Sequence, residues 1–149
     1  MALQRLDHIS IVVRDLEAAI DFFVELGLNV DGRSPISGDW VDTVVGIPGL
    51  RAEIAMMRTP DGSGIIELTR FDEPAAVETT PSPDTPQALG LRSIMFAVTD
   101  VDATVDRMSA VGGELIGSIA RYEDQYRLCY LRGPEGIIVA LAEELTPQA

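Results

Sequence analysis

The chain contains an internal repeat, and this feature restricts its possible folds more than any other. When the sequence is shifted by 85 positions, the segment Leu6–Asp15 falls on the segment Leu91–Asp100. The match continues without a gap through two pairs of glycines, Gly27 with Gly112 and Gly32 with Gly117. Self-similarity of this kind indicates that one structural unit occurs twice. We therefore expect the two halves to share one fold.

A second match, at an offset of 74, extends the repeat toward the end of each half. It places Pro60-Asp61-Gly62 on Pro134-Glu135-Gly136. One residue is then lost, so that Ile66-Glu67-Leu68 falls on Val139-Ala140-Leu141. Proline, acidic and glycine residues in succession are typical of reverse turns. Each turn is expected to join the last two strands of its half.

Both halves show the same order of expected elements. A β-rich run ends at an aspartate, Asp15 or Asp100, whose carboxylate can cap a following helix. Gly27 suits the left-handed position after the first helix. The strands are expected at residues 6–13, 28–33, 51–59 and 64–71, and at 91–98, 114–120, 125–132 and 136–142. The sequence thus predicts an α+β fold made of two βαβββ modules.

The segment FDEPAAVETTPSPDTPQ between the halves is rich in proline, threonine and acid, which is typical of an exposed linker. We expect residues 1–149 to form a single domain of two modules, 5–71 and 90–143, joined by residues 72–89. In each module the helix covers one face of the sheet, and the other face is expected to meet the second module across a cleft. The length of the linker permits pairing within one chain or exchange between two chains.

Composition limits the partners. The formal charge of −13 and the sequence pI of about 4.2 argue against nucleic acid and against an anionic membrane surface. Cys129 is the only cysteine, which excludes an internal disulfide and is typical of a reducing compartment. Its strand-like surroundings favour a buried, inert thiol. The N-terminus has no signal-like segment and no apolar stretch reaches membrane-spanning length, so we expect a cytoplasmic protein.

The chain resembles the vicinal oxygen chelate superfamily, which includes glyoxalase I, methylmalonyl-CoA epimerase, extradiol dioxygenases and the fosfomycin and bleomycin resistance proteins. The segments that carry the resemblance are LDHISIVVRDLEAAIDFFVELGL and TPDGSGIIEL, with their second copies LRSIMFAVTDVDATVDRM and GPEGIIVAL. The resemblance implies a glyoxalase-like fold, a small-molecule ligand and pairing as a homodimer. It also implies a divalent metal such as nickel, zinc, manganese or iron, held by side chains on the first and last strands of each module.

Carried over from that resemblance, the ligand positions are His8, Glu67, Ser93 and Ala140. The first two match the family pattern, whereas Ser93 and Ala140 replace the usual histidine and glutamate. The metal site is therefore expected to be incomplete, because a tight site normally needs three or more suitable ligands. His8 and Glu67 are expected to serve as metal ligands, as an acid–base pair of catalytic residues, or as a structural hydrogen-bonded pair. The carboxylates available to complete the site are Glu53, Glu123 and Asp124.

Further candidates for substrate binding come from strand alternation and from aromatic residues. Alternation places Ser93 on the same face as Met95, and Tyr126 on the same face as Tyr130. The two phenols either enter the cleft or pack the sheet. Trp40 lies outside the expected strands in a glycine-bounded segment, as a ligand-stacking lid or as a hydrophobic plug.

Two classes of function follow from these residues. The first is an enzyme acting on a small molecule, a lyase or isomerase similar to lactoylglutathione lyase or methylmalonyl-CoA epimerase, with an incomplete metal site. An extradiol dioxygenase is disfavoured because His8 is the only histidine. The alternative is a metal-free protein that binds and sequesters a small molecule or antibiotic. A scaffold without small-molecule chemistry is less attractive, because small residues are expected along the cleft wall.

Overall fold

The computed structural model describes residues 4–79 and 86–145 and divides the chain into two compact units, Met1–Val77 and Glu78–Ala149. Residues 80–85, which form part of the expected linker, lie outside the described residues. None of the helices in the described ranges combines the length and the apolar character needed to cross a membrane.

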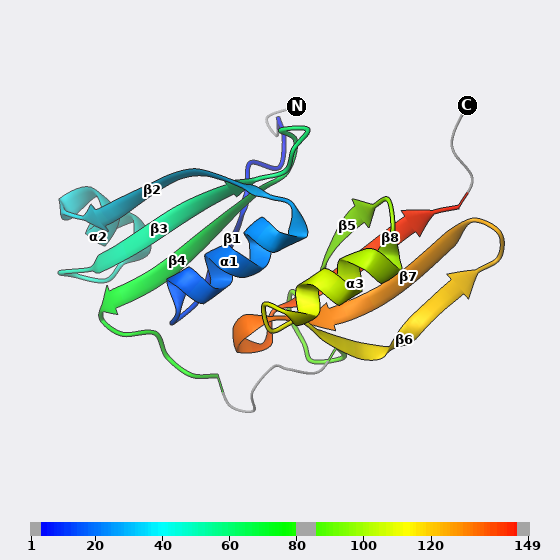
Figure 1. Cartoon of the computed structure of the whole chain (residues 1–149). Coiled ribbons are helices and arrows are strands. Elements are labelled where there is room, and N and C mark those ends of the chain that lie inside the picture. The colour runs from blue at the N-terminus through cyan, green and yellow to red at the C-terminus, as the bar shows by residue number, and fades with distance from the viewer. Residues whose placement is uncertain (1–3, 80–85, 146–149) are drawn as a thin grey trace. The chain divides into compact units, whose positions relative to one another are not determined.

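The first unit is a four-stranded sheet with α1 on one face (Figure 1). The strand order is β1-β4-β3-β2; β1 runs parallel to β4, and the other pairs are antiparallel. The elements of this unit are β1 (Ile9–Val12), α1 (Leu16–Leu26), β2 (Asn29–Ser37), α2 (Asp39–Val45), β3 (Arg51–Arg58) and β4 (Ile65–Glu73).

The second unit repeats this arrangement with the strand order β5-β8-β7-β6 and with α3 against its sheet (Figure 1). Its elements are β5 (Ile94–Val98), α3 (Val101–Ser109), β6 (Glu114–Tyr122), β7 (Tyr126–Arg132), the short 3₁₀ turn η1 (Pro134–Gly136) and β8 (Ile138–Glu144). The predicted α+β fold of two βαβββ modules is confirmed.

Strand register also supports the repeat residue by residue. Ile9 pairs with Ile66 in the first unit, and Ile94 pairs with Val139 in the second. These are the residues that the sequence alignment of the two halves makes equivalent. One result is that Ser10 lies opposite Glu67 just as Met95 lies opposite Ala140.

The expected strand limits differ from the observed ones in places. The first strand begins at Ile9 rather than Leu6, because its parallel partner β4 itself begins only at Ile65. His8 therefore stands one residue before β1, and Ser93 stands one residue before β5. Strand β2 continues to Ser37, beyond the expected end at Arg33, and pairs with β3 along that length. The reverse turn expected at 134–136 is a 3₁₀ turn.

The helices begin where the sequence predicts. The carboxylate of Asp15 accepts a hydrogen bond from the N–H of Ala18 over 2.9 Å, and Asp100 does the same for Ala103. Gly27 ends α1 with a positive φ of 124°, which a residue with a side chain rarely adopts. The buried side of α1 carries Phe22 and Phe23, whose rings meet edge to face.

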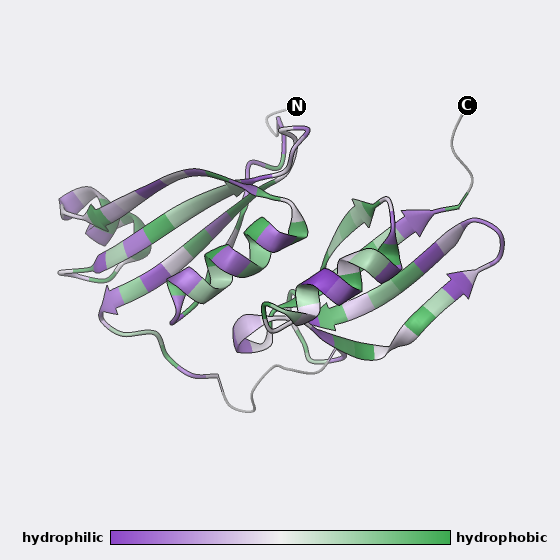
Figure 2. Ribbon diagram, viewed as in Figure 1, coloured by the Kyte–Doolittle hydropathy of each residue, from purple (hydrophilic) through white to green (hydrophobic). Residues whose placement is uncertain are grey.

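Alternation divides each sheet into two faces. In the first unit Leu68 and Met57 are buried on the side of α1, whereas Glu67 and Met56 point the other way. We call the side turned away from α1 or α3 the distal face of that unit. Figure 2 shows the resulting alternation of apolar and polar residues along the strands. The helix side of each sheet forms the core of its unit, and the distal face lies outside the contact with the helix.

The sequence analysis did not predict α2. It follows Gly38, ends at Gly46 in the left-handed conformation, and buries Val41. The carboxylate of Asp42 accepts hydrogen bonds from the N–H groups of Gly49 and Leu50, over 2.8 Å and 3.0 Å, and so fixes the connection to β3. A small cluster covers one end of the distal face of the first unit; it comprises Val41, Leu50, Ala52, Ile36, Ile47 and Phe71. The second unit has only a short hairpin at the equivalent place.

Candidate functional site

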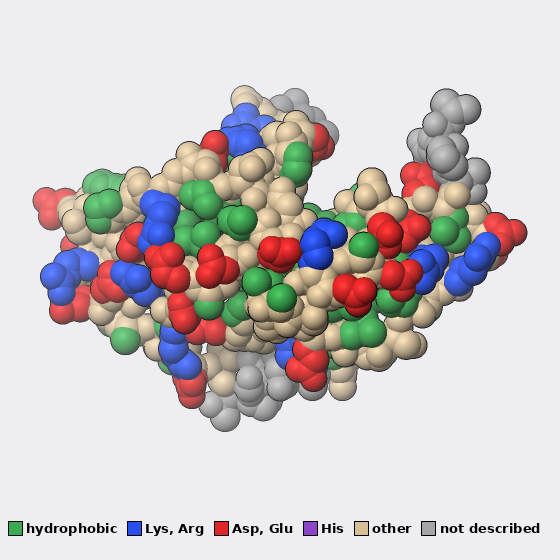
Figure 3. Space-filling model, viewed as in Figure 1, with side chains coloured by type: hydrophobic (Ala, Val, Ile, Leu, Met, Phe, Trp, Pro, Cys, Tyr) green, Lys and Arg blue, Asp and Glu red, His purple; other side chains and the backbone are tan. Residues whose placement is uncertain are grey.

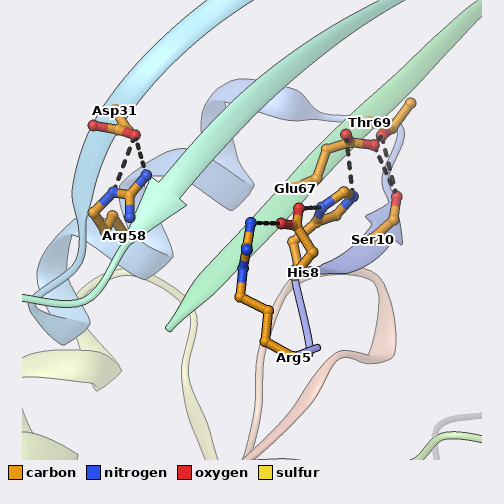
Figure 4. Close-up of polar contacts among 8 residues, drawn as sticks. Arg5, His8, Ser10, Asp31, Arg58, Glu67 and Thr69 are labelled. Atoms are coloured by element: carbon orange, nitrogen blue, oxygen red, sulfur yellow. Dashed lines mark hydrogen bonds and ion pairs between the residues drawn. The ribbon is translucent and has the colours of Figure 1, made fainter. Parts of the chain in front are cut away.

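His8 and Glu67 face one another on the distal face of the first unit (Figure 4). The distance from His8 Nε2 to Glu67 Oε2 is 3.6 Å. Parallel pairing of β1 with β4 creates this proximity, because Ser10 is the register partner of Glu67 and His8 precedes it by two residues on the same side. Both side chains are partly accessible, with 33% and 22% of their surfaces exposed. The two strongest candidates from the sequence therefore lie together.

The other carboxylate oxygen of Glu67 is held by hydroxyl groups. Ser10 Oγ donates a hydrogen bond to Glu67 Oε1 over 3.1 Å, and Thr69 Oγ1 donates to the same atom over 3.0 Å. These hydroxyls come from neighbouring strands and are themselves 3.4 Å apart. They orient the carboxylate so that Oε2 is directed toward His8 (Figure 4).

The second ring nitrogen of His8 has a partner as well. His8 Nδ1 lies 2.9 Å from Asp7 Oδ2, and Arg5 holds the other oxygen of Asp7 at 2.8 Å. The hydrogen bond from His8 lowers the pKa of Asp7, and Arg5 lowers it further. An ionised carboxylate only accepts hydrogen bonds, so the proton on this contact belongs to His8 Nδ1.

That contact determines what His8 Nε2 can do. When the imidazole is neutral with its proton on Nδ1, the lone pair of Nε2 is directed toward the carboxylate of Glu67. The lone pair of His8 Nε2 and the carboxylate of Glu67, 3.6 Å apart, both attract a positively charged group. A proton on Nε2 satisfies this requirement, and so does a cation bound by both groups.

The described residues only partly fit a divalent metal. Two ligand atoms of a tetrahedral zinc ion lie about 3.3 Å apart when the metal bonds are near 2.0–2.1 Å. The 3.6 Å distance from His8 Nε2 to Glu67 Oε2 is only slightly longer than that. However, no group of three or more His, Cys, Asp or Glu side chains suitable for a metal occurs in residues 4–79 and 86–145. Ser10 and Thr69 supply neutral hydroxyls, which are weaker ligands. The pair is one strong ligand short of a tight site.

None of the three extra carboxylates is part of this cluster. Glu53 lies on the helix side of β3, where it pairs with Arg33 at 2.7 Å and with Arg70 at 3.1 Å. Glu123 and Asp124 belong to the β6–β7 hairpin of the second unit. Figure 3 shows acidic and basic side chains side by side on the visible surface.

Among residues 86–145, the second unit carries no equivalent cluster. Ala140 takes the place of Glu67 and is 1% exposed, and Met95 takes the place of Ser10 and is 59% exposed. Tyr126 and Tyr130 point to the same distal face as Ala140, as strand alternation predicts. The side chain of Tyr130 is exposed, and that of Tyr126 is half-buried. At the positions equivalent to Ser10 and Glu67, this face carries the apolar side chains of Met95 and Ala140.

Trp40 is not a hydrophobic plug. Its position in α2 leaves it 60% exposed, and the neighbouring Val41 fills the core instead. Cys129 is buried, as expected, and burial raises the pKa of its thiol, with a further contribution from the charge of Asp102. A group of this kind stays protonated and is a poor nucleophile at neutral pH.

Sequence reasoning missed Asp7 in this cluster. The hydrogen bonds from Ser10 and Thr69 to the carboxylate of Glu67 also needed coordinates. Adjacent residues on a strand point in opposite directions, which argues against a contact between Asp7 and His8. The contact forms because β1 begins only at Ile9, so this pair lies in irregular chain. The one available signal was an acidic residue next to the only histidine.

The family model described as Glyoxalase/Bleomycin resistance protein/Dioxygenase superfamily matches residues 5–141. The chain belongs to this superfamily. Among solved structures, a glyoxalase family protein from Bacillus cereus is 47% identical, with a TM-score of 0.92 and coverage of 98% of this chain and 99% of that one. No protein with a curated description matches significantly.

More distant structures share the fold alone. A genomically encoded fosfomycin resistance protein, FosX, from Listeria monocytogenes is 18% identical, with a TM-score of 0.59 and coverage of 95% of this chain and 94% of that chain. An antibiotic binding protein, TnmS3, from Streptomyces sp. CB03234 is 21% identical, with a TM-score of 0.59 and coverage of 97% and 98%.

Proposed function

We propose that this protein binds a small molecule at the distal face of its first unit and moves a proton on it, as a lyase or isomerase. The observation that carries the proposal is the pairing of His8 Nε2 with Glu67 Oε2 at 3.6 Å, with the remaining polar atoms of both groups already engaged. An imidazole and an oriented carboxylate on one accessible surface are suited to acid–base chemistry. An atom of a ligand can lie within hydrogen-bond distance of both.

In the proposed reaction Glu67 is the base. Its carboxylate takes a proton from a carbon next to a carbonyl group, and the electron pair of the broken C–H bond moves toward the carbonyl oxygen. His8, protonated on Nε2 and paired with Asp7 through Nδ1, donates a hydrogen bond to that oxygen. Return of the proton from Glu67 to a different carbon of the delocalised anion, with a shift of the double bond, gives an isomer. Departure of a neighbouring group with its electron pair, followed by transfer of the proton from Glu67 to that group, gives the products of a lyase reaction.

A divalent metal bound by His8 and Glu67 would polarise the carbonyl oxygen in place of the protonated imidazole. With two strong ligands its affinity should be low. Calorimetric titration of chelator-treated protein with nickel, zinc, manganese or ferrous ions measures this directly. Absence of binding below about millimolar concentrations would remove the metal from the proposal.

The main experiment is a thermal-shift screen of the wild type and of Glu67→Gln. The panel contains 2-oxo acids, aromatic acids, fosfomycin and cationic antibiotics. A ligand at 100 times its dissociation constant stabilises the folded state by about 2.7 kcal/mol. We expect at least one compound to stabilise the wild type and to lose most of that effect in Glu67→Gln, which should fold normally. Equal stabilisation of both proteins would contradict the assigned site.

A second candidate function is sequestration of a small molecule or antibiotic without catalysis. The replacement of usual ligands by Ser93 and Ala140, and the fold shared with an antibiotic binding protein, support it. The two functions differ in the fate of the ligand. After incubation with a binding compound in heavy water, mass spectrometry detects deuterium or a new product if a proton is moved, and an unchanged ligand if it is only bound.

A further inference from the structure

We propose that Asp7 is a positioning residue that fixes the proton of His8 on Nδ1 and so reserves Nε2 for Glu67 and its ligand. This inference rests on the proposed function for its biological meaning, but not for its geometry. Three contacts form a chain from Arg5 to Asp7, from Asp7 to His8, and from His8 to Glu67.

The direction of the proton follows from the partners. Asp7 is ionised and accepts hydrogen bonds only, so His8 Nδ1 must be the donor in the 2.9 Å contact. A neutral imidazole has one N–H, and placing it on Nδ1 leaves Nε2 as the basic atom. If the proton were on Nε2 instead, it would be directed toward Glu67, and Nδ1 would meet Asp7 as a second acceptor. The Nδ1–H tautomer is favoured because the 2.9 Å contact with Asp7 is a hydrogen bond, whereas the 3.6 Å separation from Glu67 is too long for one.

Arg5 supports the contact between Asp7 and His8 by holding the carboxylate of Asp7. Its guanidinium contacts Asp7 Oδ1 at 2.8 Å, while Oδ2 contacts the imidazole. The carboxylate is consequently fixed from both sides, although 60% of its surface is exposed. A hydrogen-bonded carboxylate behind a working histidine is a common way to set ring orientation and tautomer.

The repeat provides an internal comparison. The residue equivalent to Asp7 in the second unit is Arg92, and the residue equivalent to His8 is Ser93. The unit without the imidazole also lacks the carboxylate next to it. The carboxylate is therefore present in the unit that has the histidine and absent at the equivalent position of the unit that lacks it.

The single histidine makes the proposal easy to test. Protein without a histidine tag, labelled with ¹⁵N in the imidazole ring and treated with a chelator, gives NMR signals from His8 alone. At about pH 9, well above the usual histidine pKa of about 6.5, the two ¹⁵N shifts report which nitrogen carries the proton. We expect the Nδ1–H form to dominate in the wild type.

The variants are Asp7→Ala, Asp7→Asn and the control Asp21→Ala, which removes an exposed carboxylate from α1. Asp7→Ala should reverse the majority tautomer to Nε2–H, the form that histidine prefers in water. Asp7→Asn keeps an acceptor oxygen and should retain the Nδ1–H form, and Asp21→Ala should match the wild type. Thermal unfolding of all four proteins verifies that they fold.

A dominant Nε2–H form in the wild type, or an unchanged tautomer in Asp7→Ala, would overturn the proposal. A tautomer that responds equally to Asp7→Ala and to Asp21→Ala would overturn it as well, since the effect would then reflect net charge. This readout is independent of the proposed function. The ligand screen with Glu67→Gln can fail while the tautomer behaves as expected, and the reverse also holds.

Discussion

The two distal faces of this molecule share one strand arrangement and differ in the side chains at equivalent positions. In the first unit Ser10 is the register partner of Glu67, and in the second Met95 is the register partner of Ala140. Two residues further along the same strands, Thr69 of the first unit is equivalent to Ala142 of the second. The helix sides differ far less, since Leu68 and Leu141 are both fully buried. The core thus preserves the repeat, and the distal faces have diverged in the chemistry of their side chains.

The largest expected effect tests the similarity of the helix sides. Leu68→Ala and Leu141→Ala each leave a cavity in a closely packed core, so each should lower the free energy of unfolding by about 2–5 kcal/mol. Urea denaturation measures both. Losses that differ by more than about twofold would show that the units do not depend equally on their cores.

The next effect tests the difference between the distal faces. Ala140→Glu places a carboxylate at a position 1% exposed, where Met95 stands in place of the serine of the first unit and Tyr130 is the other register partner. The cost of burying it should reach about 1–3 kcal/mol. Met95→Ser, added to Ala140→Glu, recreates the serine of the first unit and should recover part of the loss. Equal stability of Ala140→Glu and the wild type would contradict this account.

A smaller effect is expected from the hydroxyls that hold Glu67. Thr69→Val keeps the shape of the side chain and removes its donated hydrogen bond, which should cost about 0.5–1.5 kcal/mol. Ser10→Ala should cost less because Ser10 is exposed. Both variants should weaken ligand binding more than they weaken folding. If only the free energy of unfolding changes, the hydroxyls are structural.

The smallest effect concerns the turn between β3 and β4. Hydrogen bonds from Thr59 and Ser63 lower the pKa of Asp61 from 3.8 to about 2. The carboxylate therefore stabilises the folded state above pH 3.8, and this contribution is lost as the pH falls toward 2. Asp61→Asn should lower the melting temperature slightly at pH 7 and leave it unchanged near pH 2. An equal difference at both pH values would exclude the pKa as the cause.

Much of the fold could be predicted because the repeat supplied two independent copies of each signal. Asp15 and Asp100 marked the starts of α1 and α3, and the equivalent turns marked the last strands. Helix α2 was missed because it has no second copy and only seven residues, too few for a clear helical period. The site was partly predictable, since the resemblance to the superfamily placed His8 and Glu67 at two of its ligand positions. The contact of Asp7 with His8 was not, because it depends on the course of the chain before β1.

The most direct test of the central claim is a double-mutant cycle on ligand affinity with His8→Ala, Glu67→Gln and the double variant. The compound is the one that stabilises the wild type most in the thermal-shift screen. If His8 and Glu67 work as one centre, each single variant should weaken binding about tenfold or more, and the double variant should bind no more weakly than the worse single variant. Losses that simply add, or single variants that bind as tightly as the wild type, would contradict the account.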